Sequence, residues 1–113
     1  MTGIGVDIAD IQRFRDAIKK SGAERFLANN FSKLEKEYCA SYRDPAPHYA
    51  GTFAAKEAVR KVSDKFLIPF SDIEIRRAKT GRPEVWIKGR RARTLQLSIS
   101  HGTHDAVAVA LHI

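Results

Sequence analysis

FAAKEAVRK, residues Phe53–Lys61, is a run of strong helix formers without Gly or Pro. It lies within a helix-like pattern from about Tyr49 to Phe66, where apolar residues recur at spacings of three and four. The apolar stripe comprises Ala55, Ala58, Val59, Val62 and Phe66. Phe53, Glu57 and Lys61 form the neighbouring stripe. We therefore expect a long central helix with Glu57 at the edge of its buried face.

A carboxylate at the edge of a core needs a partner, because burying an unpaired charge is costly. Lys61 is one turn beyond Glu57 and could pair with it on the helix surface. The small residues Ala54 and Ala58 would instead allow another backbone or a ligand to approach Glu57. Taken by itself, the helix favours the ordinary ion pair.

The first eight residues alternate as in a strand, and one face carries Ile4, Val6 and Ile8. Asp7 projects from the opposite face, beside Gly3 and Gly5. Strands are poor in Asp, and Gly within a strand often marks close approach of another group. Two interpretations remain open: a functional carboxylate, or a strand end where Asp7 and Asp10 begin the next helix.

The remaining chain alternates between helical and strand patterns. Helices are predicted at 10–22, 23–28 and 32–41, the last with a capping box of Ser32 and Glu35, and the segment 44–47 ends it. Strands are predicted near 71–76, 85–87, 95–100 and 107–111, joined by a turn at 79–83, a basic connector at 89–94 and a turn at 101–105. These patterns predict one α+β domain over residues 1–113, with helices, including the long central one, on a mainly antiparallel sheet.

Composition narrows the class of protein. The chain has 113 residues, of which 43% are hydrophobic, as expected of a small globular domain rather than a disordered one. Its longest apolar stretch, 106–111, is too short to cross a membrane, and the single Cys39 excludes an internal disulfide. We expect a cytoplasmic protein without a leader. The net charge of +7 predicts an anionic partner, without choosing among nucleic acid, a phosphorylated ligand and an acidic protein.

Three segments together resemble a known family. They are Gly3–Ile8, Phe53–Ala58 and Ser98–His101, and their order and spacing are similar to those of the holo-acyl-carrier-protein synthases, the small 4′-phosphopantetheinyl transferases. The likeness covers nearly the whole chain. It implies transfer of the 4′-phosphopantetheine arm from coenzyme A to a serine of apo-acyl carrier protein, a step of fatty acid biosynthesis that releases adenosine 3′,5′-bisphosphate.

The resemblance also implies roles for three charged residues. Asp7 and Glu57 match the two carboxylates that hold Mg²⁺ in the family, and oxygen ligands suit this ion. The base that takes the serine proton would be Glu57 or a water held by the metal, and the choice stays open. Lys61 matches a basic position that helps bind phosphate, with the ion pair to Glu57 as an equal alternative.

The expected coenzyme A contacts come from the second half of the chain. The segment that ends in Ser100 and His101 matches the family, and the match implies that His101 contacts coenzyme A. The ordinary alternative for a histidine at a strand end is a solvated turn residue. Gly81-Arg82-Pro83 resembles the family's Gly-Lys-Pro turn, which would help hold the nucleotide's phosphate, and is otherwise an ordinary hairpin turn. The other histidines match nothing in the family and are predicted to lie on the surface: His48, His104 and His112.

Further expectations concern partners. Arg13 and its helix resemble the basic surface that receives acyl carrier protein, and the family is typically homotrimeric with its site between subunits. The segment 63–69 is short and glycine-free where the family has a longer glycine-rich loop, which leaves coenzyme A contacts there in doubt. The alternatives are a non-catalytic coenzyme A-binding relative and a small basic nucleic-acid-binding module, for which Trp86 is the best candidate stacking residue. We expect no nucleic acid and no membrane partner.

Overall fold

The computed structural model describes residues 3–62 and 68–113. Its helices are α1 (Ile11–Ala17), α2 (Ala23–Asn30), α3 (Lys33–Ala40) and α4 (Ala46–Lys61), with a short 3₁₀ turn η1 (Phe70–Asp72). Its strands are β1 (Gly3–Asp10), β2 (Ile73–Arg77), β3 (Pro83–Ile87), β4 (Arg90–Arg91), β5 (Leu95–His101) and β6 (Asp105–His112). No helix of this part of the chain is long and apolar enough to span a membrane.

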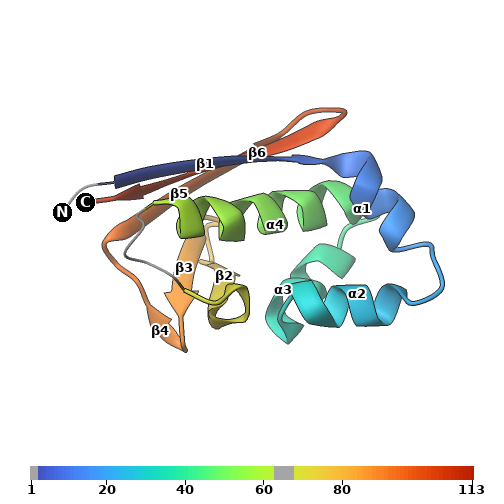
Figure 1. Ribbon diagram of the computed structural model, residues 1–113, viewed down its shortest axis with the longest axis horizontal. Helices are drawn as coiled ribbons and strands as arrows, with labels where there is room; N and C mark the ends of the chain where they lie inside the picture. Colours follow the sequence, from blue (N-terminus) through green and yellow to red (C-terminus); the bar gives the residue numbers. More distant parts are fainter. Residues whose placement is uncertain (1–2, 63–67) are drawn as a thin grey trace.

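The strands form two antiparallel sheets, in the orders β1-β6-β5 and β2-β3-β4. Helix α4 lies along one face of the β1-β6-β5 sheet, which we call the inner face, while α2, α3 and the smaller sheet lie on the far side of α4 (Figure 1). This arrangement confirms the predicted α+β class and the long central helix. The single domain over residues 1–113 stays a prediction.

Some predicted boundaries differ from the observed ones. Helix α3 ends at Ala40, before the predicted break, whereas helix α4 begins at Ala46 rather than near Tyr49. Ala46 and Pro47, predicted to lie in the break, are in its first turn, where a proline is tolerated because its missing N–H has no intrahelical partner. Helix α1 ends at Ala17 rather than near residue 22. The short β4 lies within the predicted connector. Phe66 and most of the 63–69 segment lie outside the described residues.

Two local predictions are confirmed. The capping box of α3 is present: the Ser32 hydroxyl accepts a hydrogen bond from the Glu35 backbone N–H at 3.2 Å, and Glu35 Oε1 accepts one from the Ser32 backbone N–H at 2.8 Å. The described members of the predicted α4 stripe are buried: Ala55, Ala58, Val59 and Val62.

The contact between α4 and β1 is close because the facing residues are small. A Cβ atom added to Gly5 would overlap the carbonyl oxygen of Ala58, and one added to Gly3 would overlap that of Val62. The central strand β6 presents three fully buried alanines to the helix, Ala106, Ala108 and Ala110. The large apolar residues of the same strands therefore project from the opposite, outer face.

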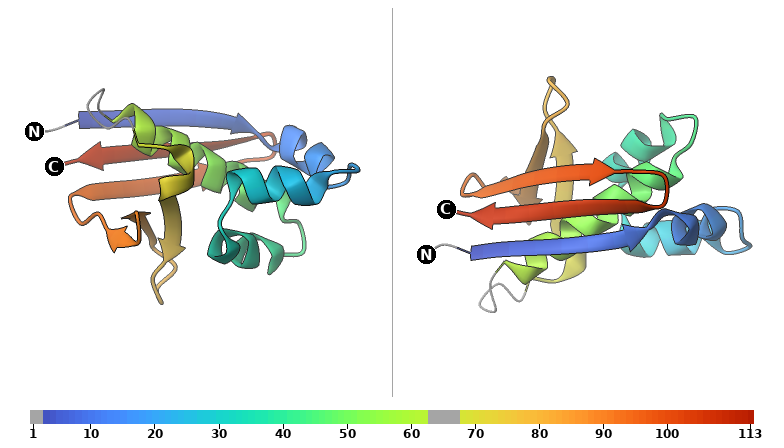
Figure 2. Two further views of the ribbon diagram at one scale, coloured as in Figure 1. Left: turned by 60° about the horizontal axis from the view of Figure 1, so that its bottom comes forward. Right: turned by 90° about the horizontal axis from the view of Figure 1, so that it is seen from above.

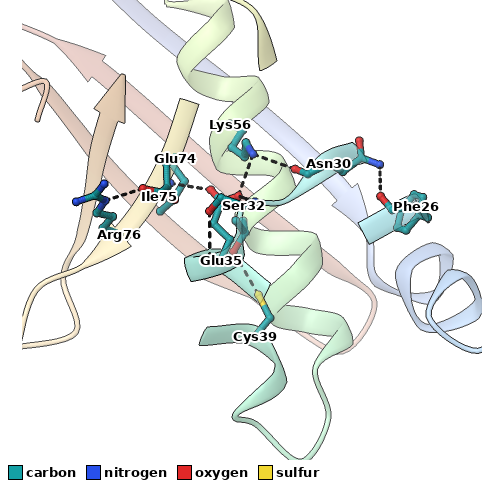
Figure 3. A network of polar contacts seen from close by, with 10 residues as sticks. Phe26, Asn30, Ser32, Glu35, Cys39, Lys56, Glu74, Ile75 and Arg76 are labelled. Atoms are coloured by element: carbon teal, nitrogen blue, oxygen red, sulfur yellow. Dashed lines mark hydrogen bonds and ion pairs between the residues drawn. The ribbon is translucent and has the colours of Figure 1, made fainter. Parts of the chain in front are cut away.

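A buried ion pair links α3 to α4 (Figure 3). Lys56 Nζ lies 2.9 Å from Glu35 Oε1 and donates a second hydrogen bond, also 2.9 Å, to the carbonyl oxygen of Asn30. Glu35 Oε2 accepts a 2.7 Å hydrogen bond from the backbone N–H of Ile75. The network thus joins the end of α2, α3, α4 and β2.

We predict that Lys56→Met lowers the free energy of unfolding by about 3–5 kcal/mol, because it leaves the Glu35 carboxylate buried without its cation. Arg60→Met is the matched control on the same helix: it removes an exposed pair with Glu57, at 3.3 Å, and should cost less than about 1 kcal/mol. Urea denaturation at one protein concentration measures both. Equal losses in the two variants would contradict a stabilising role for the buried pair.

Candidate functional site

Two carboxylates predicted to act together flank one lysine, and we call Asp7, Glu57 and Lys61 the carboxylate site. Asp7 lies on the inner face of β1, opposite Ala108 of β6. Lys61, from the last turn of α4, donates a 2.8 Å hydrogen bond to Asp7 Oδ1. The pKa of Lys61 is raised, first by this hydrogen bond and the charge of Asp7, and also by the charge of Glu57. The first strand and the central helix therefore bring both carboxylates to the same ammonium group.

The observed partners differ from the ion pair that the helix alone favoured. Lys61 contacts Asp7, whereas Glu57 pairs with Arg60 at 3.3 Å. The side chains of Asp7 and Glu57 are 16% and 27% exposed, so both reach solvent at the rim of the α4–β1 contact. Lys61, with its side chain 53% exposed, is open to solvent and is not part of the core.

The donor atoms suit a hard divalent cation. Carboxylate oxygens are the ligands that Mg²⁺ prefers, and this ion commonly keeps several waters or takes phosphate oxygens as its remaining ligands. Within residues 3–62 and 68–113, no group of three or more His, Cys, Asp or Glu side chains gathers to hold a metal. An ion at the carboxylate site would thus complete its shell with water or a phosphorylated ligand.

A second cluster surrounds His101 at the end of β5. The ring of His101 lies 5.6 Å from that of His48, in the first turn of α4. Between them and β2 is a pocket of about 200 Å³, which we call the imidazole pocket. Its lining residues are Tyr38, Pro47, His48, Gly51, Arg77, Ile99 and His101.

Sequence reasoning missed two residues of this pocket. His48 was predicted to lie on the surface, yet it is half-buried beside His101, and burial together with the nearby His101 and Arg77 lowers its pKa. Arg77 comes from β2, far from both histidines in sequence. No spacing in the sequence could reveal this grouping, because its members come from separate elements that meet only in the tertiary fold.

The other predicted coenzyme A residues lie on or near β5, but they do not line the imidazole pocket with His101. Ser100 is exposed on the outer face, the opposite face to His101. The Gly81-Arg82-Pro83 turn joins β2 to β3, and Gly81 has a φ of 89°, which suits glycine in a tight turn. Arg82 donates a 3.1 Å hydrogen bond to Gln96 Oε1 on β5. Arg13 is exposed on α1, with its guanidinium 5.3 Å from the ring centroid of Phe53 on α4.

The carboxylate site and the imidazole pocket lie at opposite edges of the β1-β6-β5 sheet. Helix α4 crosses the inner face diagonally, from β5 near its start to β1 near its end (Figure 2). Near its start Gly51 approaches Ile99 of β5, and near its end Ala58 approaches Gly5 of β1. One chain therefore has both carboxylates near Lys61 at the β1 edge, and His101 at the β5 edge.

Comparisons with known proteins agree over nearly the whole chain. The family model of the 4′-phosphopantetheinyl transferase superfamily matches residues 3–111. The holo-[acyl-carrier-protein] synthase of Clostridium kluyveri is 42% identical over 120 residues, covering 96% of this chain and 87% of that protein. The crystal structure of the Helicobacter pylori holo-[acyl-carrier-protein] synthase in complex with coenzyme A is similar with a TM-score of 0.77 and 30% identity, covering 95% of this chain and 96% of that one.

We predict that Gly5→Ala lowers the free energy of unfolding by about 1–3 kcal/mol, because the added methyl group overlaps the Ala58 carbonyl oxygen and forces β1 away from α4. Gly102→Ala is the matched control, since a Cβ atom there would meet nothing within 4 Å. Urea denaturation compares the two. If both variants unfold like the parent protein, the close packing that positions Asp7 against α4 is not required.

Proposed function

We propose that this chain, which belongs to the 4′-phosphopantetheinyl transferase superfamily, transfers the 4′-phosphopantetheine group of coenzyme A to a serine of apo-acyl carrier protein. It is an enzyme of the transferase class, and we place its reaction in the cytoplasm. Relatives named as holo-[acyl-carrier-protein] synthases and their coenzyme A complexes support this proposal. The observation that supports it most is that Lys61 binds Asp7 at 2.8 Å and also feels the charge of Glu57, at an exposed rim.

In the proposed reaction the serine oxygen attacks the phosphorus on the pantetheine side of the diphosphate, and adenosine 3′,5′-bisphosphate leaves with the electrons of the broken P–O bond. Asp7 and Glu57 would hold Mg²⁺, which when bound neutralises charge on the diphosphate. The Lys61 ammonium supplies another positive charge to the phosphates, and its raised pKa keeps it protonated. The serine proton passes to Glu57 or to a water beside it.

The residues proposed to contact coenzyme A lie at the other edge of the sheet. They are His101 and Ser100 on β5 and the Gly81-Arg82-Pro83 turn beside it. A single coenzyme A that contacts them and the carboxylate site of the same chain would have to pass around α4. A second copy would remove this difficulty by placing its β5 edge beside the β1 edge of the first. We therefore propose that the complete site lies between two copies of the chain.

The outer face of the sheet supports such an assembly. Ile4, Val6 and Ile8 are 67%, 55% and 63% exposed, and Leu111, which is paired with Ile4, is 41% exposed. A continuous apolar face of this kind is typical of an interface. A twofold contact brings identical patches together, whereas joining β1 edges to β5 edges is a head-to-tail contact that closes as a ring. We propose the homotrimer that the resemblance implies.

The acidic carrier protein would approach along α1. The exposed Arg13 lies against Phe53, on the stripe of α4 that also carries Glu57, so a partner bound there would be near the carboxylate site. Attraction between a chain of net charge +7 and an acidic partner would make the encounter fast and salt-dependent.

The structure weakens the nucleic-acid alternative, because Trp86, its best candidate stacking residue, already has contacts within the chain. The Arg76 guanidinium lies 3.8 Å from the centroid of the Trp86 ring, and Trp86 Nε1 donates a 3.2 Å hydrogen bond to Glu84. One face of the ring is therefore already covered. A non-catalytic coenzyme A-binding relative keeps the same residues, and only an activity assay separates it from the transferase.

Mass spectrometry of apo-acyl carrier protein incubated with the chain, coenzyme A and Mg²⁺ tests the proposal. We expect a gain of one phosphopantetheine that a chelator abolishes. Asp7→Asn and Glu57→Gln should each slow transfer by at least about a hundredfold, because each removes a charge that stabilises the transition state. Asp16→Asn and Glu24→Gln, at exposed carboxylates of α1 and α2, are the controls. Rapid transfer by either site variant would overturn the site, and coenzyme A binding without transfer would favour the non-catalytic relative.

Light scattering after gel filtration tests the assembly. We expect the parent chain to be a trimer and Val6→Arg to be a monomer, because a charge would be buried on the outer face. Leu34→Arg, at an apolar residue on α3 that is 47% exposed, should leave the trimer intact.

Mixed assemblies then test whether two copies share one site. Asp7→Asn and His101→Ala chains should each be poorly active alone and regain activity when unfolded and refolded together, since an intact Asp7 can then face an intact His101. Absence of any recovery in assemblies shown to contain both chains would contradict a shared site.

A further inference from the structure

The two carboxylates of the carboxylate site each have a cation of their own. Lys61 Nζ lies 2.8 Å from Asp7 Oδ1, and Arg60 Nη1 lies 3.3 Å from Glu57 Oε1. Both cations come from the last turn of α4, where they are adjacent in the chain. Two negative and two positive side chains thus meet at this rim, and together they carry no net charge.

This neutrality opposes the uptake of a divalent cation by the free chain. An added ion would place two positive charges beside Lys61 and Arg60, and it would have to replace them as the partners of the carboxylates. The diphosphate of coenzyme A is anionic and would offset the added charge. The charge balance therefore favours binding of the ion and of coenzyme A together.

Arg60 and Lys61 can exchange their partners at little cost. Their side chains are 44% and 53% exposed, and exposed ion pairs of this kind are weak in water. Both have flexible stems and several N–H donors, which suit phosphate oxygens as well as carboxylates. Basic residues in the last turn of a helix also suit the helix dipole, but that role concerns the stability of the helix and not the affinity of the site for a metal ion.

We infer that Lys61 and Arg60 are exchangeable counter-ions, which neutralise the two carboxylates in the free chain and turn to the phosphates of coenzyme A when those carboxylates take up a divalent cation. This inference rests on the proposed function, and it adds Arg60 to the proposed site as a positioning residue. Whichever ligand binds first causes the two ion pairs to be given up, so the second ligand binds without that cost. The metal ion and coenzyme A should therefore raise each other's affinity by the same factor.

Calorimetric titration with Mn²⁺, an ion that suits carboxylate ligands as Mg²⁺ does, tests the inference with and without coenzyme A. Acyl carrier protein is left out, so the readout does not depend on transfer. Without coenzyme A, Lys61→Met should bind Mn²⁺ about two- to fivefold more tightly than the parent chain, which corresponds to the loss of an exposed ion pair. Arg60→Met should show a smaller rise, because its ion pair is longer. With saturating coenzyme A, both variants should bind Mn²⁺ as the parent chain does.

Two further variants are the controls. Lys33→Met, at an exposed lysine of α3, removes the same charge outside the carboxylate site and should leave the affinity for Mn²⁺ unchanged. Asp7→Asn should weaken Mn²⁺ binding both with and without coenzyme A, because it removes one of the two proposed ligands.

Four results would overturn the inference. They are an unchanged Mn²⁺ affinity of the free chain in either Lys61→Met or Arg60→Met, a rise of the same size with and without coenzyme A, an equal rise in Lys33→Met, and undiminished Mn²⁺ binding by Asp7→Asn. If the expected affinities are found but no carrier protein is modified, the proposed function fails and the exchange of partners stands. If carrier protein is modified but the affinities do not differ, only the inference fails.

Discussion

The structure depends on the close contact between α4 and the small residues of the β1-β6-β5 sheet. Backbone meets backbone where Gly5 faces Ala58, and the alanines of β6 fill the remaining space. Side chains of ordinary size at these positions would push the helix outward. Asp7 and Lys61 could then no longer form their 2.8 Å hydrogen bond. The geometry of the carboxylate site therefore depends on the small size of the neighbouring glycine and alanine residues.

The same contact explains the unusual outer face of the sheet. Because the inner face carries glycine and alanine, the large apolar residues of β1 and β6 are left on the side away from the helix. The second face of this sheet therefore exposes large apolar residues to solvent, as is typical of a surface that another molecule covers. The proposed assembly of copies would supply that cover and would also place the β5 edge beside the β1 edge. The small residues on the inner face thus explain both the packing of the core and the proposed division of the site between copies.

The charged side chains of the proposed site also differ between the β1 edge and the β5 edge of the sheet. Asp7 on β1 and Glu57 near the end of α4 are the two carboxylates proposed to hold the cation, while the imidazole pocket near β5 gathers an arginine and two histidines. The buried Lys56–Glu35 pair has no place in either group, although Lys56 directly precedes Glu57 in the chain. Its hydrogen bonds fix α3 and β2 against α4, so two adjacent residues of one helix have different roles: Lys56 stabilises the fold, and Glu57 belongs to the proposed site.

Sequence alone determined the class of fold and the α3 capping box, because each depends on local periodicity or on motifs in a fixed order. It also placed the described stripe of α4 in the core. Only the tertiary structure decided which face of the first strand meets the helix, since alternation alone does not distinguish inside from outside. It likewise decided that Lys61 contacts Asp7 rather than Glu57, and that Arg77 joins His48 and His101. Those contacts join residues far apart in the chain, and only the packing of α4 between the sheets brings them within reach.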